Sequence, residues 1–272
     1  MSWEYYKGAL VPKQEIHFDI RISKQEANSL LKTSSALFIR YTTDFDQEQN
    51  SPAYYVIKDT WEAIDELSAN TRYIIRKALR MCDVRKINKE IMIRQGYEVY
   101  YTHTVNFKLR KINILKCDQY LKMIENLSDR EFFGCFDRQS GKLIGYSQNE
   151  IGEGVCYSTT KANPIYYRGY YPFYALFYTM NEYYLQVCKK KYVSDGFRTL
   201  DQHSGIQDFL ISKFKFRKAY CKLHLHYIWW LKFLVNMIYP FRNIIWSGKI
   251  KNLLFQEEIS RKSKATKFKF LN

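Results

Sequence analysis

Three residues near the end of one short predicted strand carry side chains suited to acid–base chemistry. Asp195 closes the predicted strand Lys191–Asp195, Arg198 follows it, and His203 lies in the next loop. Ligands gather at the carboxyl ends of strands in open α/β sheets, and histidine can accept a proton at neutral pH without a large pKa shift. We therefore predict Asp195, Arg198 and His203 as catalytic candidates; a plain surface role is the alternative for His203.

Two other groups of residues have suitable types but unsuitable spacing. Asp201, His203 and Ser204 are the residue types of a hydrolytic triad, but neighbours within one loop rarely align for proton transfer. His224 and His226 share one face of a predicted strand, as a pair of metal ligands could. The chain contains no Cys-x-x-Cys or His-Glu-x-x-His motif. We predict neither a triad nor a metal site.

A basic helix face is predicted between Asn70 and Met81. Arg72, Arg76 and Arg80 recur at four-residue spacing, so their side chains lie one above another. Guanidinium groups in such a row can bind successive phosphate oxygens of nucleic acid or of an anionic substrate. The alternative is a solvated face without a partner.

These candidates need a scaffold, which the periodicity predicts as a mixed, mainly antiparallel sheet flanked by helices, an α/β (α+β) fold with an N-terminal β-rich extension and a C-terminal amphipathic helix. The predicted strands are Ile16–Ile22, Ala36–Phe45, Ala53–Lys58, Glu131–Asp137, Lys142–Ile151, Val155–Thr160, Lys191–Asp195 and Ala219–Tyr227. The predicted helices begin at Trp61 (capped by Asp59-Thr60), Asn70, Ile114, Pro172 and Ile206, and Glu90–Phe107 fits helix or strand. We divide the chain into 1–60, 61–227 and 228–272.

The order of elements between Trp61 and Tyr227 resembles the catalytic core of GNAT acyltransferases, and the FemAB-like branch in particular. The resemblance rests on this order and on the stretches Leu67–Lys77, Pro172–Met180 and Gly205–Phe216. It implies an N-acyltransferase that moves an acyl or aminoacyl group to an amine, for example on a cell-envelope or polysaccharide precursor. The implied co-substrate is an acyl-CoA such as acetyl-CoA, or an aminoacyl-tRNA, with no permanently bound cofactor.

The same resemblance implies an anion site at the start of the helix after the three-stranded meander. The matching residues here are Tyr167, Arg168, Gly169, Tyr170 and Tyr171. Unpaired backbone N–H groups and the helix dipole favour negative charge at such a position. The acetyl-CoA signature of GNAT enzymes has two spaced glycines and this loop has one, which favours the FemAB-like alternative. The tyrosine acid that many GNAT enzymes carry in the last helix is also absent.

Composition limits the functional classes further. The 272 residues include 17% aromatics and carry a formal net charge of +16. Such a content of aromatic residues excludes a disordered chain. The positive charge predicts attraction to polyanions, namely RNA, a phosphorylated cofactor or an anionic membrane, with an inert basic surface as the alternative. Six cysteines without close pairs indicate reduced thiols, and we expect a cytoplasmic protein.

The stretch from Tyr227 to Trp246 is rich in aromatic and aliphatic residues. Lys232, Pro240 and Arg242 interrupt it too often for a membrane span. We predict an amphipathic segment that lies on the anionic inner face of a membrane; packing on the domain or a dimer contact are the alternatives. A non-catalytic GNAT-fold module that binds RNA or membrane is the alternative to an enzyme.

Overall fold

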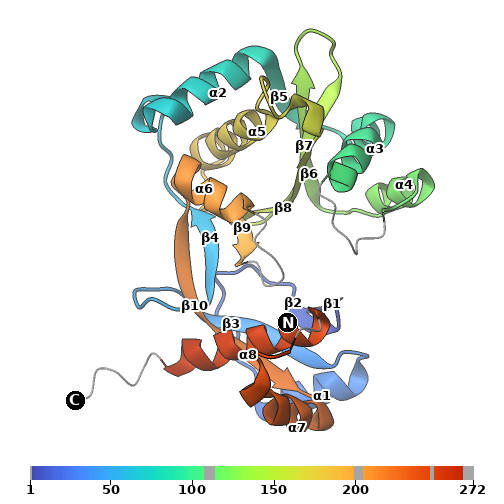
Figure 1. Cartoon of the computed structure of the whole chain (residues 1–272), viewed down its shortest axis with the longest axis vertical. Coiled ribbons are helices and arrows are strands. Elements are labelled where there is room, and N and C mark those ends of the chain that lie inside the picture. Colours follow the sequence, from blue (N-terminus) through green and yellow to red (C-terminus); the bar gives the residue numbers. More distant parts are fainter. Residues whose placement is uncertain (1, 107–113, 199–204, 246–247, 266–272) are drawn as a thin grey trace. The chain divides into compact units, whose positions relative to one another are not determined.

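The computed structural model describes residues 2–106, 114–198, 205–245 and 248–265 (Figure 1). The described residues form a ten-stranded, mostly antiparallel sheet with strand order β1-β2-β3-β10-β4-β9-β8-β7-β6-β5, together with helices. This confirms the predicted fold class of a mixed sheet flanked by helices. No helix in these ranges has the length and apolarity needed to cross a membrane.

The described residues form ten strands and eight α-helices. The strands are β1 (Trp3–Tyr6), β2 (Ala9–Pro12), β3 (Phe38–Gln47), β4 (Tyr54–Lys58), β5 (Cys82–Ile87), β6 (Arg130–Asp137), β7 (Leu143–Ile151), β8 (Val155–Ala162), β9 (Val193–Phe197) and β10 (Arg217–Tyr227). The α-helices are α1 (Lys24–Thr33), α2 (Ala69–Met81), α3 (Lys89–Asn106), α4 (Cys117–Glu125), α5 (Pro172–Asn181), α6 (Ile206–Phe214), α7 (Trp229–Ile238) and α8 (Gly248–Ala265).

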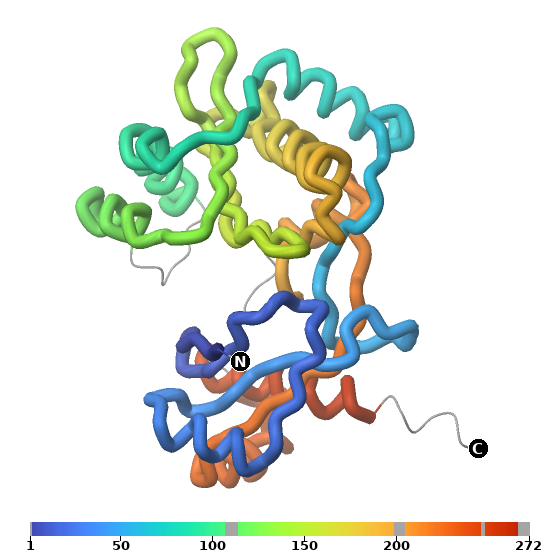
Figure 2. Tube along the Cα trace, turned by 180° about the vertical axis from the view of Figure 1, so that it is seen from behind, coloured from blue at the N-terminus to red at the C-terminus, as the bar shows by residue number. Residues whose placement is uncertain are grey.

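Contacts divide the chain into two compact units. The central unit comprises residues 57–196 and 206–217, and the terminal unit comprises 1–56, 197–205 and 218–272. The path of the chain in each unit can be followed by colour in Figure 2. Each unit has its own hydrophobic core.

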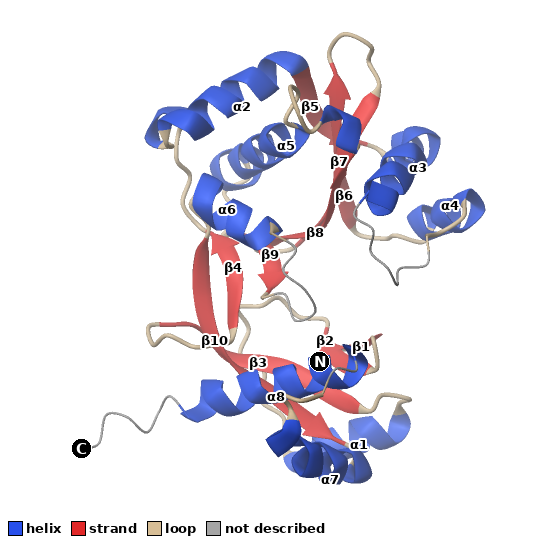
Figure 3. Ribbon diagram, viewed as in Figure 1, coloured by secondary structure: helices blue, strands red, loops and turns tan. Residues whose placement is uncertain are grey.

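The central unit is built on the antiparallel strands β5 to β8 (Figure 3). Alternate residues of β7 point to opposite faces: Tyr146 joins the core formed with α3 and α4, whereas a Cβ on Gly145 would lie 3.3 Å from Leu176 of α5. Because both faces are covered, the strands have nearly continuous buried runs rather than strict alternation.

The predicted meander is confirmed in β6, β7 and β8, as are the helices beginning at Pro172 and Ile206. The helix predicted at Trp61 is wrong, because only one 3₁₀ turn, Ile64–Glu66, forms there. Asp59, the predicted cap, instead forms an ion pair with Arg217. The ambiguous stretch Glu90–Phe107 is helix α3.

The terminal unit pairs β3 with β10 over a long antiparallel ladder, and α1, α7 and α8 belong to the same unit. The strand predicted at Ile16–Ile22 is wrong: these residues are irregular. Asp19 accepts a hydrogen bond from the backbone N–H of Asp44 (2.7 Å) and Ile20 is buried. The alternating pattern therefore reflects packing against the unit rather than strand pairing.

A close helix–helix approach in the central unit provides a stability test. Gly96 in α3 faces Tyr120 of α4, and a Cβ at this position would lie 2.3 Å from the Tyr120 hydroxyl oxygen. Glycine to alanine normally stabilises a helix, but here the buried Tyr120 ring has to move. We expect Gly96→Ala to lower the free energy of unfolding by about 1–3 kcal/mol in urea denaturation.

The matched control is Gly248→Ala, where an added Cβ meets nothing within 4 Å. We expect this variant to unfold within a few tenths of a kcal/mol of the parent protein. Equal stabilities of the Gly96→Ala protein and its parent would contradict the close packing of α3 on α4.

Candidate functional site

The parallel strands β8 and β9 pair over a short ladder in the central unit. Within the described residues they share two residue pairs, Val155 with Val193 and Cys156 with Ser194. Beyond this point Gly196 has φ +81°, a left-handed conformation, and its N–H donates to Ser194 Oγ (2.9 Å). The β7–β8 ladder shifts register at the same level, between the pairs of Gln148 and Asn149. A register shift of this kind marks a β-bulge or irregularity, and β-bulges are common beside active sites.

Asp195 is the first residue of β9 after the last pair of this ladder. Burial raises the pKa of its carboxyl from 3.8 to about 7, and a hydrogen bond from Gln207 of α6 opposes part of this rise. Asp195 also interacts electrostatically with Cys156 and Tyr157 of β8. A carboxyl of this kind exchanges its proton near neutral pH, as a general acid or base must.

A buried polar network lies along the α5 face of the sheet. Ser147 Oγ donates to Asn149 Oδ1 (2.7 Å) and lies 3.0 Å from Thr160 Oγ1 of β8. Asn149 Nδ2 donates to the Tyr184 hydroxyl (3.1 Å). Ser147, Asn149 and Tyr184 are buried and Thr160 is half-buried, so their hydrogen bonds hold β7, β8 and the helical segment over them in one arrangement.

The network continues to the surface through Tyr184. This residue lies in a π-helix, Glu182–Val187, that follows α5, and its hydroxyl donates to Glu131 Oε2 (3.1 Å). Glu131 in turn forms an ion pair with Lys86 of β5. Single π-helical turns are frequent at functional sites. These residues were not among the predicted site residues, although the polar run Ser147–Glu150 in an otherwise apolar strand was a signal.

The start of α5 is the predicted anion site, and no side chain caps this helix. Its first flanking residue, Tyr171, is in the left-handed region (φ 51°). Arg168 is exposed, and Gly169 (φ +93°) has nothing within 4 Å of where a Cβ would be. Within the described residues, the backbone N–H groups of Arg168, Gly169 and Tyr170 donate to no partner. Cations and uncapped N–H groups at a helix start favour a phosphate or carboxylate.

The three predicted tyrosines of this loop contact neighbouring side chains and the backbone. The Tyr167 hydroxyl lies 3.0 Å from His103 Nδ1 and donates to the carbonyl of Ala162 (3.1 Å). The Tyr171 ring lies 5.6 Å from Lys77 Nζ, and Tyr170 packs edge-on against Tyr166 at 5.0 Å between ring centres.

His103 of α3 is a residue of this region that the sequence analysis did not select. Burial, followed by the nearby charge of Lys161, lowers its pKa to about 4, so its imidazole is neutral at pH 7. Its bond to Tyr167, whose own pKa burial raises to about 12, ties α3 to the loop before α5. No sequence pattern pairs these two residues, because they are 64 positions apart.

Arg198, the second predicted catalytic residue, is engaged within the terminal unit. Arg198 belongs to the terminal unit, where its Nη1 donates to the carbonyl of Pro52 (2.7 Å) and its guanidinium lies over the rings of Tyr54 and Phe255. These contacts give Arg198 a role in packing. Its catalytic role stays a prediction. His203 lies outside the described residues.

The three arginines of α2 are partly engaged by one acidic residue. Arg72 Nη1 donates to the backbone carbonyl of Asp65 (2.8 Å), and Arg76 Nη2 forms an ion pair with the Asp65 carboxylate (2.6 Å). Arg80 is exposed at the end of the helix. The nearby carboxylate weakens the positive potential of this face, and phosphate binding by Arg72, Arg76 and Arg80 stays a prediction.

The histidine pair of β10 is bonded within the terminal unit. His224 Nε2 lies 2.9 Å from Thr43 Oγ1, and His226 Nε2 lies 3.3 Å from the Tyr41 hydroxyl. Burial lowers the pKa of both imidazoles, that of His224 to about 4. Among the described residues there is no group of three or more His, Cys, Asp or Glu side chains arranged to hold a metal ion.

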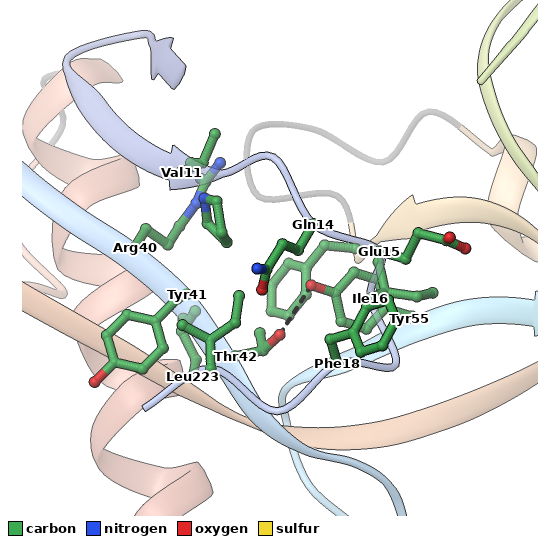
Figure 4. Close-up of a pocket in the computed structure, with 13 residues that line it drawn as sticks. Val11, Gln14, Glu15, Ile16, Phe18, Arg40, Tyr41, Thr42, Tyr55 and Leu223 are labelled. Atoms are coloured by element: carbon green, nitrogen blue, oxygen red, sulfur yellow. Dashed lines mark hydrogen bonds between the residues drawn. The ribbon is translucent and has the colours of Figure 1, made fainter. Parts of the chain in front are cut away.

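A separate cavity of about 140 Å³ lies in the terminal unit (Figure 4). Most of its wall is apolar, and the hydroxyls of Thr42 and Tyr55, 3.0 Å apart, Gln14 and Arg40 add polar groups. A cavity of this size admits a small ring or a few ordered waters. Its lining comes from distant segments of the chain, so no single stretch of sequence indicated it.

Comparison with solved structures identifies the fold. FemX matches with a TM-score of 0.55 at 12% sequence identity, over 79% of this chain and 77% of FemX. The C-terminal domain of a protein from Agrobacterium fabrum, assigned as a lysylphosphatidylglycerol synthetase, matches with a TM-score of 0.51 at 9% identity, over 81% of this chain and 78% of that domain.

The chain therefore has a GNAT-like fold of the FemAB-like kind, which confirms the resemblance inferred from the order of elements. No protein-family model and no curated protein matches the sequence. At these identities the likeness establishes the fold, and the chemistry has to be argued from the residues of this chain.

The raised pKa of Asp195 has a measurable consequence for stability. Because the folded protein binds this proton more tightly than the unfolded chain, stability falls as pH rises from about 4 through about 7. Asparagine keeps a bond to Gln207 but carries no charge. We expect Asp195→Asn to be more stable than the parent by on the order of 2 kcal/mol at pH 8, and nearly equal to it at pH 4.

Urea denaturation of both proteins at the two pH values measures this difference. Asp208→Asn, at an exposed position in the first turn of α6, is the control and is expected to show no such pH-dependent gain. A gain for Asp195→Asn that is the same at pH 4 and pH 8 would show that this carboxyl titrates normally.

Proposed function

We propose that this protein is an N-acyltransferase that moves an aminoacyl or acyl group from a large anionic donor to an amine. The observation that carries the proposal is Asp195, a buried carboxyl with a pKa near 7, placed where β8 and β9 part. The uncapped start of α5 in the same unit adds a place for the donor's phosphate. The likeness of fold to FemX supports a transferase of this kind.

The reaction would use Asp195 as a general base. The carboxylate accepts a proton from the acceptor amine, whose nitrogen attacks the donor carbonyl carbon and forms the new C–N bond. The C–O bond of an aminoacyl ester, or the C–S bond of a thioester, breaks, and the leaving oxygen or sulfur takes up the proton that the Asp195 carboxyl has accepted. A pKa near the working pH lets Asp195 accept the proton and release it again in each cycle.

Aminoacyl-tRNA is the donor that we favour over acyl-CoA. The loop at the start of α5 has a single glycine, Gly169, with Arg168 beside it, so it offers little backbone for wrapping a pyrophosphate. A net charge of +16 suits a polyanionic donor, because positive surface potential speeds association with nucleic acid. We propose an amine on a cell-envelope or polysaccharide precursor as the acceptor.

A thermal-shift screen tests the donor class first. The purified protein is heated with acetyl-CoA, longer acyl-CoAs, uncharged tRNA and aminoacyl-tRNA at a fixed salt concentration. A ligand present at about 100 times its Kd stabilises the folded state by about 2.7 kcal/mol, which raises the Tm by several degrees. A rise with aminoacyl-tRNA is expected, and no rise with any of these ligands would remove the support for a transferase.

Charge reversal at the start of α5 tests the donor site. Arg168→Glu places a negative charge beside the uncapped N–H groups, so we expect donor affinity to fall about tenfold to a hundredfold. Arg94→Glu, an exposed change of the same charge on α3, is the control and is expected to retain affinity within about threefold. Filter binding at two salt concentrations measures both variants, and equal losses would point to net charge rather than to this loop.

Asparagine at position 195 tests the proposed base. The Asp195→Asn protein should bind the donor with an unchanged Kd, because this carboxyl lies on β9 and the proposed donor phosphate site lies before α5. Transfer from the donor found in the screen to a free amine should fall by about 10²–10⁴. Transfer at the parental rate would exclude Asp195 as the base.

A further inference from the structure

Helix α7 of the terminal unit exposes large apolar side chains along one side. Trp229 is 83% exposed, Phe233 69% and Met237 55%. Their spacing of four residues places them on one face of the helix. Trp230 and Leu234 extend this face around the helix, and Phe241 and Ile244 continue it past the helix end; these seven residues are called the α7 face below.

The opposite side of α7 already has its partners. Leu231 and Val235 are buried against Leu254 of α8, with Ile228 and Ile238 packed at the edges of this small core. The helix is therefore apolar on two sides, one of which is covered by the unit itself. A helix of this kind is normally buried all round, so the α7 face lacks the cover that its composition calls for.

The charge around the α7 face indicates what covers it. Lys232 and Asn236 form the narrow polar strip of the helix, and both are exposed. The sequence contains no Asp or Glu from Phe209 to Gln256, whereas Lys232, Lys249 and Lys251 lie close to the face along the chain, and Arg242 is paired with Glu258 of α8. Two copies of this mainly positive segment would repel each other. A negatively charged apolar partner would complement it.

We propose that the α7 face binds an anionic lipid bilayer, with α7 lying in the plane of the interface. Tryptophan rings prefer the headgroup level, where the apolar body is buried and the indole N–H stays wet. Phe233 and Met237 reach into the acyl region, and Lys232 extends along the helix to the lipid phosphates. The inference does not depend on the proposed acyl transfer, because all of its residues lie in the terminal unit.

Vesicle binding tests this inference on the full chain. The protein is floated with vesicles of phosphatidylcholine alone and with vesicles that also contain phosphatidylglycerol. We expect binding to the anionic vesicles, and a loss of at least tenfold in partition for the triple variant Trp229→Ser, Phe233→Ser, Met237→Ser. Lys232→Gln should reduce binding to anionic vesicles about fivefold, which is the effect of one basic residue near the surface.

The matched control is Tyr5→Ser, Tyr73→Ser, Val187→Ser, which removes three apolar side chains that are exposed to a similar degree elsewhere. Circular dichroism and urea unfolding confirm that each variant is folded before its binding is compared. Equal losses in the two triple variants, or no binding of the parent to anionic vesicles, would overturn the proposal. So would a dimer in light scattering that only the α7 variant converts to monomer, because a second copy would then be the cover.

Discussion

The early end of the β8–β9 ladder is the constraint on which the candidate site depends. Two residue pairs of the described part of the chain hold the strands together. Past them, Gly196 turns β9 with a left-handed backbone, and the β7–β8 ladder shifts register at Asn149. Backbone that leaves a ladder has to find other partners or face a ligand. Asp195 stands at this point, and its partial burial there produces the raised pKa that makes the carboxyl useful at neutral pH.

Buried hydrogen bonds join β7 to the π-helical turn that follows α5. Ser147, Asn149 and Tyr184 are bonded to one another across β7 and the π-helical turn, and Glu131 and Lys86 continue the network to the surface. A buried polar group without a partner costs more than its bond contributes. The network therefore penalises any arrangement in which the end of α5 and the π-helical turn after it slide over the sheet.

The features that could bind anionic partners of this basic protein, whose net charge is +16, lie in both units. The central unit holds the carboxyl and the uncapped helix start, whereas the terminal unit holds a small cavity and the uncovered side of α7. An acyl transfer to a precursor that resides at a membrane would use both properties in one protein. Each property rests on separate contacts, so each can be removed by substitution without the other.

The sequence alone determined the meander, the helices after Pro172 and Ile206, and hence the GNAT-like order, because periodicity reports which side of an element is buried. It also singled out Asp195 and the loop at Arg168 by their position in that order. Only the tertiary structure decided that Ile16–Ile22 is irregular, that His103 meets Tyr167, and that the pKa of Asp195 rises. These outcomes depend on burial and on partners distant in the chain, which a local pattern does not encode.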